Sequence, residues 1–242
     1  MSADIQTLEL VLKSPAQRSA RRALGKLLHW RYRLFQQKWH DTHAVLEHLQ
    51  GFPLLVLPGV LNPRLARSGE FFASQITPAS VEPGSMVLDM GTGSGVCAIA
   101  AAKLARRVCA IDINPVAVRC ARINSLLNSM EDRIEVLQGD LFAPVQGRRF
   151  DVVLFNPPFI LGAPRSDADR AWRSIDVAER FATGLTQHLT PRGYALVVRS
   201  TFGDGAEYLT HFRRCGFSLT VLAMRACLNE RLSLLRLRAA PG

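Results

Sequence analysis

The chain has 242 residues, of which 48% are hydrophobic and 21% charged, and its formal net charge is +10. These proportions are ordinary for one folded α/β domain with a small extension, and they argue against a disordered or repetitive protein. The sequence has neither the roughly 18 uncharged apolar residues in a row that a membrane span needs nor a signal-peptide pattern at residues 1–4, so we expect a cytoplasmic protein with no membrane partner.

Residues 16–50 have a helical pattern with one basic face. The basic residues are Arg18, Arg21, Arg22, Lys26, Arg31, Arg33 and Lys38, and they interleave with Leu24, Leu27, Leu28, Trp30, Leu34 and Phe35. The pattern predicts a helical, basic N-terminal extension over residues 1–50 and a main domain over residues 51–242. The basic face suits an acidic partner such as RNA or an acidic protein, and a simply solvated face is the alternative.

The first strong pattern of the main domain is a strand, a glycine turn and a helix. Residues 52–57 predict an edge or hairpin strand, and residues 58–68 a loop. A short apolar strand near 85–89 then leads into Gly91, Gly93 and Gly95 and a helix near 95–106. Because glycines allow a tight turn and let main-chain N–H groups approach a ligand closely, this segment predicts a cofactor site.

The type of cofactor is only partly decided by the local spacing. A strand near 107–112 ends in Asp112, whose carboxylate suits ribose hydroxyls. A phosphate-binding P-loop is excluded because Gly-Lys-Ser/Thr is absent, whereas residues 93–98 satisfy the dinucleotide pattern G-x-G-x-x-A. Asp89, immediately before the glycines, would crowd a pyrophosphate but suits a ligand with an amino group and positive charge, such as S-adenosylmethionine. Both cofactors remain open at this point.

Two further strands end in polar residues. The strand near 133–138 leads to Asp140 and Leu141, and the strand near 150–155 leads to Asn156-Pro157-Pro158-Phe159. The prolines make this turn rigid and leave it rich in carbonyls. The side-chain carbonyl of Asn156 and the main-chain carbonyl of Pro157 can converge on one NH2 group, with Phe159 covering its planar parent group. The alternative is a proline-rich turn that only ends a strand.

The rest of the chain continues the alternation of strands and helices. Helices are predicted near 115–128, 168–189 and 204–215, a strand near 193–199, and an antiparallel pair over 217–224 and 232–238. The loop 161–172 is either a substrate-facing lid or a polar connector, and we expect Trp172 to anchor the helix after it in the core. The alternation predicts a doubly wound, mainly parallel sheet. None of the five cysteines forms a C-x-x-C pair, so we expect reduced thiols and no metal site.

Together, and in this order, the glycine loop, the acids and the diproline turn resemble class I S-adenosylmethionine-dependent methyltransferases. The resemblance runs from about Val81 to about Val198. It is to the N-methylating branch with an (Asn/Asp)-Pro-Pro-(aromatic) motif, and in particular to the release-factor glutamine methyltransferase group and its stand-alone relatives. It implies a Rossmann-like, seven-stranded fold and S-adenosylmethionine as the cofactor.

The resemblance also implies a role for each motif. Asp89, Gly91, Gly93 and Gly95 line the methionine and ribose part of the cofactor, Asp112 takes the ribose hydroxyls, Asp140 with Leu141 meets the adenine, and Asn156, Pro157 and Phe159 clamp the acceptor nitrogen beside the cofactor. A turn or cap residue is the alternative for Asp140. For Asp112 the alternative is the N-cap of the helix that begins near Pro115, and it is compatible with ribose binding.

The implied activity is methylation of a planar nitrogen. A protein glutamine amide is the first candidate for the acceptor, and an exocyclic base nitrogen in RNA or a small aromatic amine are the alternatives. A cofactor-binding module without catalysis is a hypothesis of a different class. The release-factor group has a Pro-Arg-x-x-Thr-Glu signature, of which Arg67–Glu70 keeps the glutamate and lacks the threonine.

Overall fold

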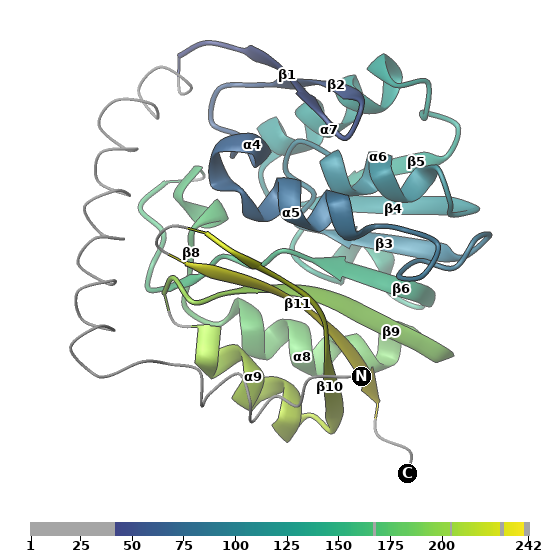
Figure 1. Ribbon diagram of the computed structural model, residues 1–242, viewed down its shortest axis with the longest axis vertical. Coiled ribbons are helices and arrows are strands. Elements are labelled where there is room, and N and C mark those ends of the chain that lie inside the picture. Colours follow the sequence, from purple (N-terminus) through teal and green to yellow (C-terminus); the bar gives the residue numbers. More distant parts are fainter. Residues whose placement is uncertain (1–41, 167, 204, 228–229, 240–242) are drawn as a thin grey trace.

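The protein is built around one sheet with the strand order β10-β11-β9-β6-β3-β4-β5 (Figure 1). The computed structural model describes residues 42–166, 168–203, 205–227 and 230–239. Strands β9, β6, β3, β4 and β5 are parallel, and β11 and β10 close the sheet as an antiparallel pair. The strands are β3 (Met86–Met90), β4 (Arg107–Asp112), β5 (Ile134–Gln138), β6 (Phe150–Phe155), β9 (Leu189–Ser200), β10 (Phe217–Ala226) and β11 (Arg231–Ala239). The predicted doubly wound, mainly parallel seven-stranded sheet is therefore confirmed.

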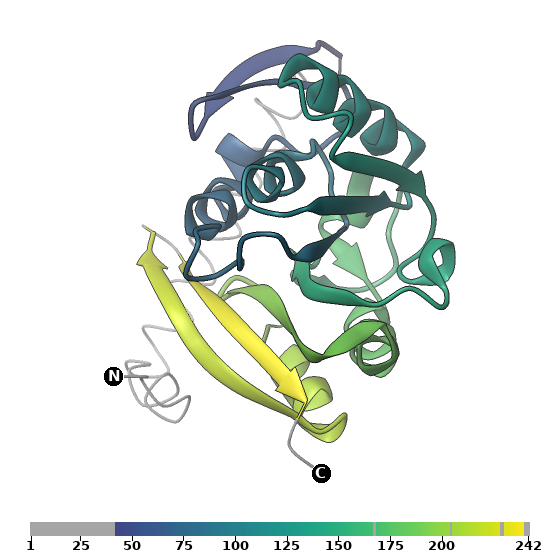
Figure 2. The same ribbon diagram turned by 90° about the vertical axis from the view of Figure 1, so that its right-hand side faces the viewer.

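Helices cover both faces of this sheet (Figures 1 and 2). One face packs against α5 (Ser68–Gln75), α6 (Val96–Ala102) and α7 (Pro115–Leu127), and the other against α8 (Val177–His188) and α9 (Gly205–Arg214). Successive strand residues alternate between two cores: Val87 lies in the same core as Phe72 of α5, and Leu88 lies with Phe181 of α8. Because both faces are covered, the central strands are apolar along nearly their whole length.

A two-stranded hairpin, β1 (Val45–Leu49) and β2 (Phe52–Val56), packs on α7. Its main anchor is Asn124, a fully buried residue of α7. Asn124 Oδ1 accepts the N–H of Leu55 at 2.7 Å, and Nδ2 donates to the Leu55 carbonyl at 2.8 Å. The same Nδ2 donates to the Ser94 carbonyl at 2.8 Å. One amide therefore joins the hairpin, α7 and the loop that contains the glycines.

The hairpin corrects part of the sequence prediction. The helix expected as far as residue 50 is wrong over Val45–Leu49, whereas the strand expected over 52–57 is confirmed. The β1 residues alternate in exposure, and the turn at Gln50 and Gly51 has φ values of 53° and 80°. The rest of the predicted basic helix falls on residues 1–41, which lie outside the described residues. The domain boundary at residue 50 and the acidic partner stay predictions.

Shorter elements complete the chain. The loop predicted over 58–68 contains α4 (Pro63–Ala66), which Asn62 caps. A short helix η2 (Ala143–Val145) follows β5. Between β6 and α8 lie β7 (Ile160–Leu161), η3 (Ala168–Ala171) and β8 (Arg173–Ser174), so the helix predicted from residue 168 begins only at Val177. Within the described ranges, no helix is both long and apolar enough to cross a lipid bilayer.

Candidate active site

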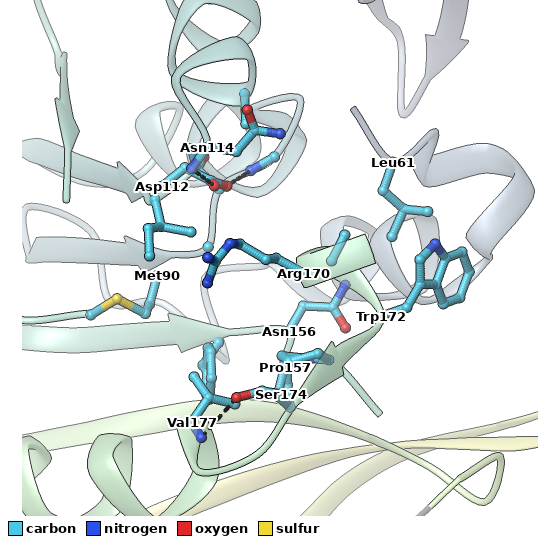
Figure 3. A pocket seen from close by; sticks show the side chains of 18 of the residues that line it. Leu61, Met90, Asp112, Asn114, Asn156, Pro157, Arg170, Trp172, Ser174 and Val177 are labelled. Carbon is cyan, nitrogen blue, oxygen red and sulfur yellow. Dashed lines mark hydrogen bonds between the residues drawn. The ribbon is translucent and has the colours of Figure 1, made fainter. Parts of the chain in front are cut away.

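A cavity of about 390 Å³ opens at the carboxyl ends of β3, β4 and β6. It brings together the polar residues that follow these strands, as expected at the switch point of a doubly wound sheet. The predicted site residues that line it are Asp89, Gly91, Gly93, Asp112, Asp140, Leu141, Asn156, Pro157 and Phe159. Figure 3 shows Asp112 and Asn156 on opposite sides of the space.

The glycines divide into two kinds. Gly91 and Gly93 have φ values of 68° and 56°, and a Cβ added to either would meet no protein atom within 4 Å. They therefore present bare main chain to the cavity. Gly95, with φ of 83°, does not line the cavity, because it starts α6 where an added Cβ would lie 3.2 Å from the Ala121 Cα atom of α7. This glycine allows two helices to pack closely behind the loop.

The carboxylate of Asp89 lies under this loop and is only 3% exposed. Thr92 Oγ1 donates to its Oδ2 at 2.6 Å. Burial raises the pKa of Asp89 to about 6, against the lowering effect of the Thr92 hydrogen bond. Ionising a carboxylate in this buried position costs free energy. A positively charged ligand group beside it would favour the ionised form.

Asp112 holds the loop in shape. Its Oδ2 accepts the N–H of Gly93 at 2.8 Å, and its Oδ1 accepts the N–H of Asn114 at 2.9 Å. Burial raises the pKa of Asp112, and the two main-chain hydrogen bonds oppose this rise. The alternative role as the N-cap of α7 is wrong, because Asn114 caps that helix by accepting the N–H of Val116.

Asp140 forms an ion pair that was not predicted. Its Oδ2 accepts from Arg180 of α8 at 2.5 Å, and Arg180 also lies 3.7 Å from Asp176. The side chains of Asp140 and Arg180 are nearly half exposed, so water screens the pair. Next to it, Leu141 has a φ of 48°, which turns the chain sharply at the cavity edge.

The turn 156–159 is held from several sides. Asn156 Nδ2 donates to Ser68 Oγ at 3.2 Å, across 88 residues of sequence. Asn156 Oδ1 is buried and has no hydrogen-bond partner among the residues that the structure describes. The hydroxyl of Tyr208 donates to the carbonyl of Pro158. Phe159 lines the cavity and is 7% exposed, since it also belongs to the core beneath α5.

The cavity also has residues that were not predicted as part of the site, among them Ser68, Arg170 and Trp172. Ser68 orients Asn156, whereas Arg170 and Trp172 come from the segment between β6 and α8. The expectation that Trp172 anchors a core helix is wrong: it precedes α8, is half buried and lines the cavity near Leu61 (Figure 3). This placement favours the substrate-facing interpretation of the loop 161–172.

Comparison with known proteins agrees with this geometry. A putative protein N5-glutamine methyltransferase from Methanocaldococcus jannaschii is 32% identical over 149 residues, which are 57% of this chain and 73% of that protein. A release factor glutamine methyltransferase from Koribacter versatilis is 31% identical over 170 residues (62% and 59%). A ribosomal protein L11 methyltransferase from Carboxydothermus hydrogenoformans is 41% identical over 108 residues (44% and 32%). The chain thus spans less than two thirds of the length of the last two relatives.

The fold is that of a class I methyltransferase. The solved 16S rRNA N2 G1207 methyltransferase of T. thermophilus, in complex with AdoMet and guanosine, superposes with a TM-score of 0.61 at 20% identity, over 81% of this chain and 50% of that one. Residues 55–217 match the family model of the Methyltransferase small domain, so the chain belongs to this family and is a methyltransferase. The resemblance found in the sequence is confirmed, and the dinucleotide alternative is set aside.

Proposed function

We propose that the protein is an S-adenosylmethionine-dependent N-methyltransferase whose acceptor is a planar nitrogen, with a protein glutamine amide as the first candidate. The observation that carries this proposal is Asn156 Oδ1, a buried acceptor without a hydrogen-bond partner in the described ranges. Leaving such an atom unpaired costs about 1–3 kcal/mol, which an incoming N–H donor would recover. An NH2 group at the acceptor nitrogen is a donor of this kind.

The residues present fit S-adenosylmethionine. Gly91 and Gly93 leave room for close approach to the main chain, and the cavity has two carboxylates, the buried Asp89 and the partly buried Asp112. When bound, this cofactor supplies a methyl group made electrophilic by a positively charged sulfur. The cofactor roles of these four residues and of Asp140 and Leu141 belong to the proposal, and Gly95 supports the loop from behind.

The acceptor nitrogen is activated mainly by its position. The lone pair of an amide or aromatic amine is delocalised, so acceptors that bind its N–H bonds draw electron density onto the nitrogen. Asn156 Oδ1 is one such acceptor, and the Pro157 carbonyl is predicted to be the second. Ser68 fixes the rotation of the Asn156 amide by accepting from Nδ2. In well-oriented intramolecular reactions such positioning contributes roughly 7–11 kcal/mol.

Replacing Gly203 with alanine tests how precisely the turn must be placed. A Cβ at Gly203 would lie 2.1 Å from the carbonyl oxygen of Phe159, so the turn would have to move. A displacement near 1 Å lowers turnover about 100-fold, and we expect kcat to fall by this factor while donor affinity is retained. Gly147→Ala is the control, since its φ of 76° causes similar strain with no atom within 4 Å. Equal kcat values in both variants would contradict the expectation.

Glutamine is the first candidate because of the relatives. The two that are named as glutamine methyltransferases match 57% and 62% of this chain, and the matched L11 enzyme 44%. The alternatives, an exocyclic RNA base nitrogen and a small aromatic amine, use the same Asn156 contact. Binding of RNA would depend steeply on salt, because phosphate contacts release counterions.

The acceptor is tested by incubating the full chain with donor labelled in its methyl group and with fractionated cell extract. We expect the label in the protein fraction, retained after nuclease and lost after protease. Acid hydrolysis should release it as methylamine, the product of an N5-methylated glutamine. Label that nuclease removes, or that stays in small molecules, would refute the glutamine acceptor. The same incubation with Asn156→Ala gives the background.

A further inference from the structure

The chain has a structured insert between the diproline turn and α8, defined as residues 160–166 and 168–176. Its two short strands are joined by hydrogen bonds from Ile160 N to the Trp172 carbonyl (2.9 Å) and from Gly162 N to the Ser174 carbonyl (3.1 Å). The insert lies directly against the cavity, which its residues from Arg170 to Asp176 line. It is therefore placed to contact whatever the cavity binds.

The insert is fixed from inside by Asp169, which is 7% exposed. Its Oδ2 accepts the N–H of Arg165 at 3.0 Å and lies 3.4 Å from Arg173 Nε. Its main-chain carbonyl accepts the N–H of Trp172 at 2.9 Å. Asp169 thus contacts residues before and after it in the insert. These contacts fix the main chain next to its neighbour Arg170.

Arg170 brings a positive charge into the cavity. Figure 3 shows its side chain extending from η3 toward the side on which Met90 and Asp112 lie. Two further arginines line the cavity: Arg173, whose Nε lies 3.4 Å from Asp169, and Arg180, which pairs with Asp140. Arg170 therefore carries its charge toward the side of the cavity that Met90 and Asp112 line (Figure 3).

The charges of the cavity and of the donor indicate which group of the donor a cation at this position suits. The buried carboxylate of Asp89 and the partly buried one of Asp112 lie beside the glycine loop. The methionine end of the donor has a sulfonium, an α-ammonium and an α-carboxylate. The two acids attract the positive groups, but they repel the α-carboxylate unless a cation offsets them. A guanidinium binds a carboxylate with two parallel, charge-assisted hydrogen bonds.

We propose that Arg170 is a donor-binding residue that holds the α-carboxylate of S-adenosylmethionine. The inference rests on the proposed function and assigns this contact to the insert, outside the glycine loop. The proposal also accounts for the hydrogen bonds of Asp169 within the insert, because a guanidinium selects a carboxylate only when the guanidinium is held in place. Asp169 is then a positioning residue for the contact.

The proposal is tested by calorimetric titration with two ligands. S-adenosylmethionine has the α-carboxylate, and decarboxylated S-adenosylmethionine keeps the amine and lacks that group. Removing a charge-assisted hydrogen bond at a partly exposed site costs roughly tenfold in affinity. We therefore expect the wild type to bind the decarboxylated ligand roughly tenfold more weakly, and Arg170→Ala to bind both ligands equally, at the weaker value. Arg165→Ala, an exposed arginine of the same insert that does not line the cavity, should behave as wild type.

Each other outcome has a separate meaning. Unchanged or tighter binding of S-adenosylmethionine by Arg170→Ala would overturn the proposal, as would an equal loss for both ligands. Asp169→Asn should weaken binding of S-adenosylmethionine more than binding of the decarboxylated ligand, and equal weakening would remove its positioning role. If the wild type bound neither ligand, the proposed function itself would fail, which is distinguishable from failure of the Arg170 contact alone.

Discussion

Asn156→Ala is expected to abolish detectable methyl transfer while leaving the affinity for S-adenosylhomocysteine nearly unchanged. The variant removes the buried acceptor Oδ1 and the donor to Ser68, so the acceptor nitrogen loses both its partner and its orientation. Loss of one preorganised polar contact in a transition state typically lowers kcat by about 100- to 1,000-fold. Single-turnover transfer and calorimetric binding on the same preparation measure the two quantities.

Two companion variants make this result specific. Asn156→Asp keeps an acceptor oxygen and should retain more activity than the alanine variant. Asn128→Ala removes an amide at the end of α7 whose bonds go to the carbonyls of Pro53 and Asn124, outside the cavity. Its transfer rate should match that of the wild type. Full transfer by Asn156→Ala would contradict the assignment of the diproline turn as the acceptor clamp.

Asp89→Asn is expected to stabilise the cofactor-free protein and to weaken donor binding. The folded pKa of Asp89 is raised from 3.8 to about 6 by burial, so between these values the folded protein keeps a proton that the unfolded chain has lost. Stability is therefore lost as pH rises through this window, and the loss is complete above about pH 6. A shift of roughly two pKa units corresponds to about 3 kcal/mol, which the asparagine avoids.

Urea unfolding at several pH values measures this effect. The free energy of unfolding of Asp89→Asn minus that of the wild type should grow from below about 1 kcal/mol at pH 4 to about 3 kcal/mol at pH 8. Donor affinity at pH 8 should fall roughly tenfold or more, because the charge facing the positive end of the donor is lost. Asp132→Asn, at an exposed position, is the control. A pH-independent stability difference would show that Asp89 is not the group responsible.

The parallel sheet was predictable because each of its strands is an apolar run followed by a turn or an acid. The first strand of the hairpin was not, since residues 45–50 fit a helical and an alternating pattern equally well over so short a length. The start of α8 was misplaced for a different reason: around Asp169, local side-chain bonds to the main chain replace the helical ones. Helix α5 was missed because it is stabilised by packing of Phe71 and Phe72 against core residues that are distant in the sequence.

The site residues also divide into those that the sequence pattern predicts and those that depend on contacts between distant segments. Asp89, Asp112 and Asn156 stand at the ends of neighbouring parallel strands, so their meeting followed from the topology alone. Ser68 and Arg180 are separated from their partners by 88 and 40 residues, and no spacing rule connects such pairs. Gly95 was assigned to the ligand because the glycine pattern does not distinguish a residue facing the cavity from one facing a helix.

The side-chain amide of Asn124 ties the hairpin to the glycine loop. Its Nδ2 group bonds both Leu55 in β2 and Ser94 in the loop, so a change that loosens one attachment alters the geometry of the other. By thermodynamic reciprocity, if a macromolecule bound at the hairpin changed donor affinity by some factor, bound donor would change the affinity for that macromolecule by the same factor. One buried amide thus links a surface hairpin by hydrogen bonds to the loop that lines the cavity.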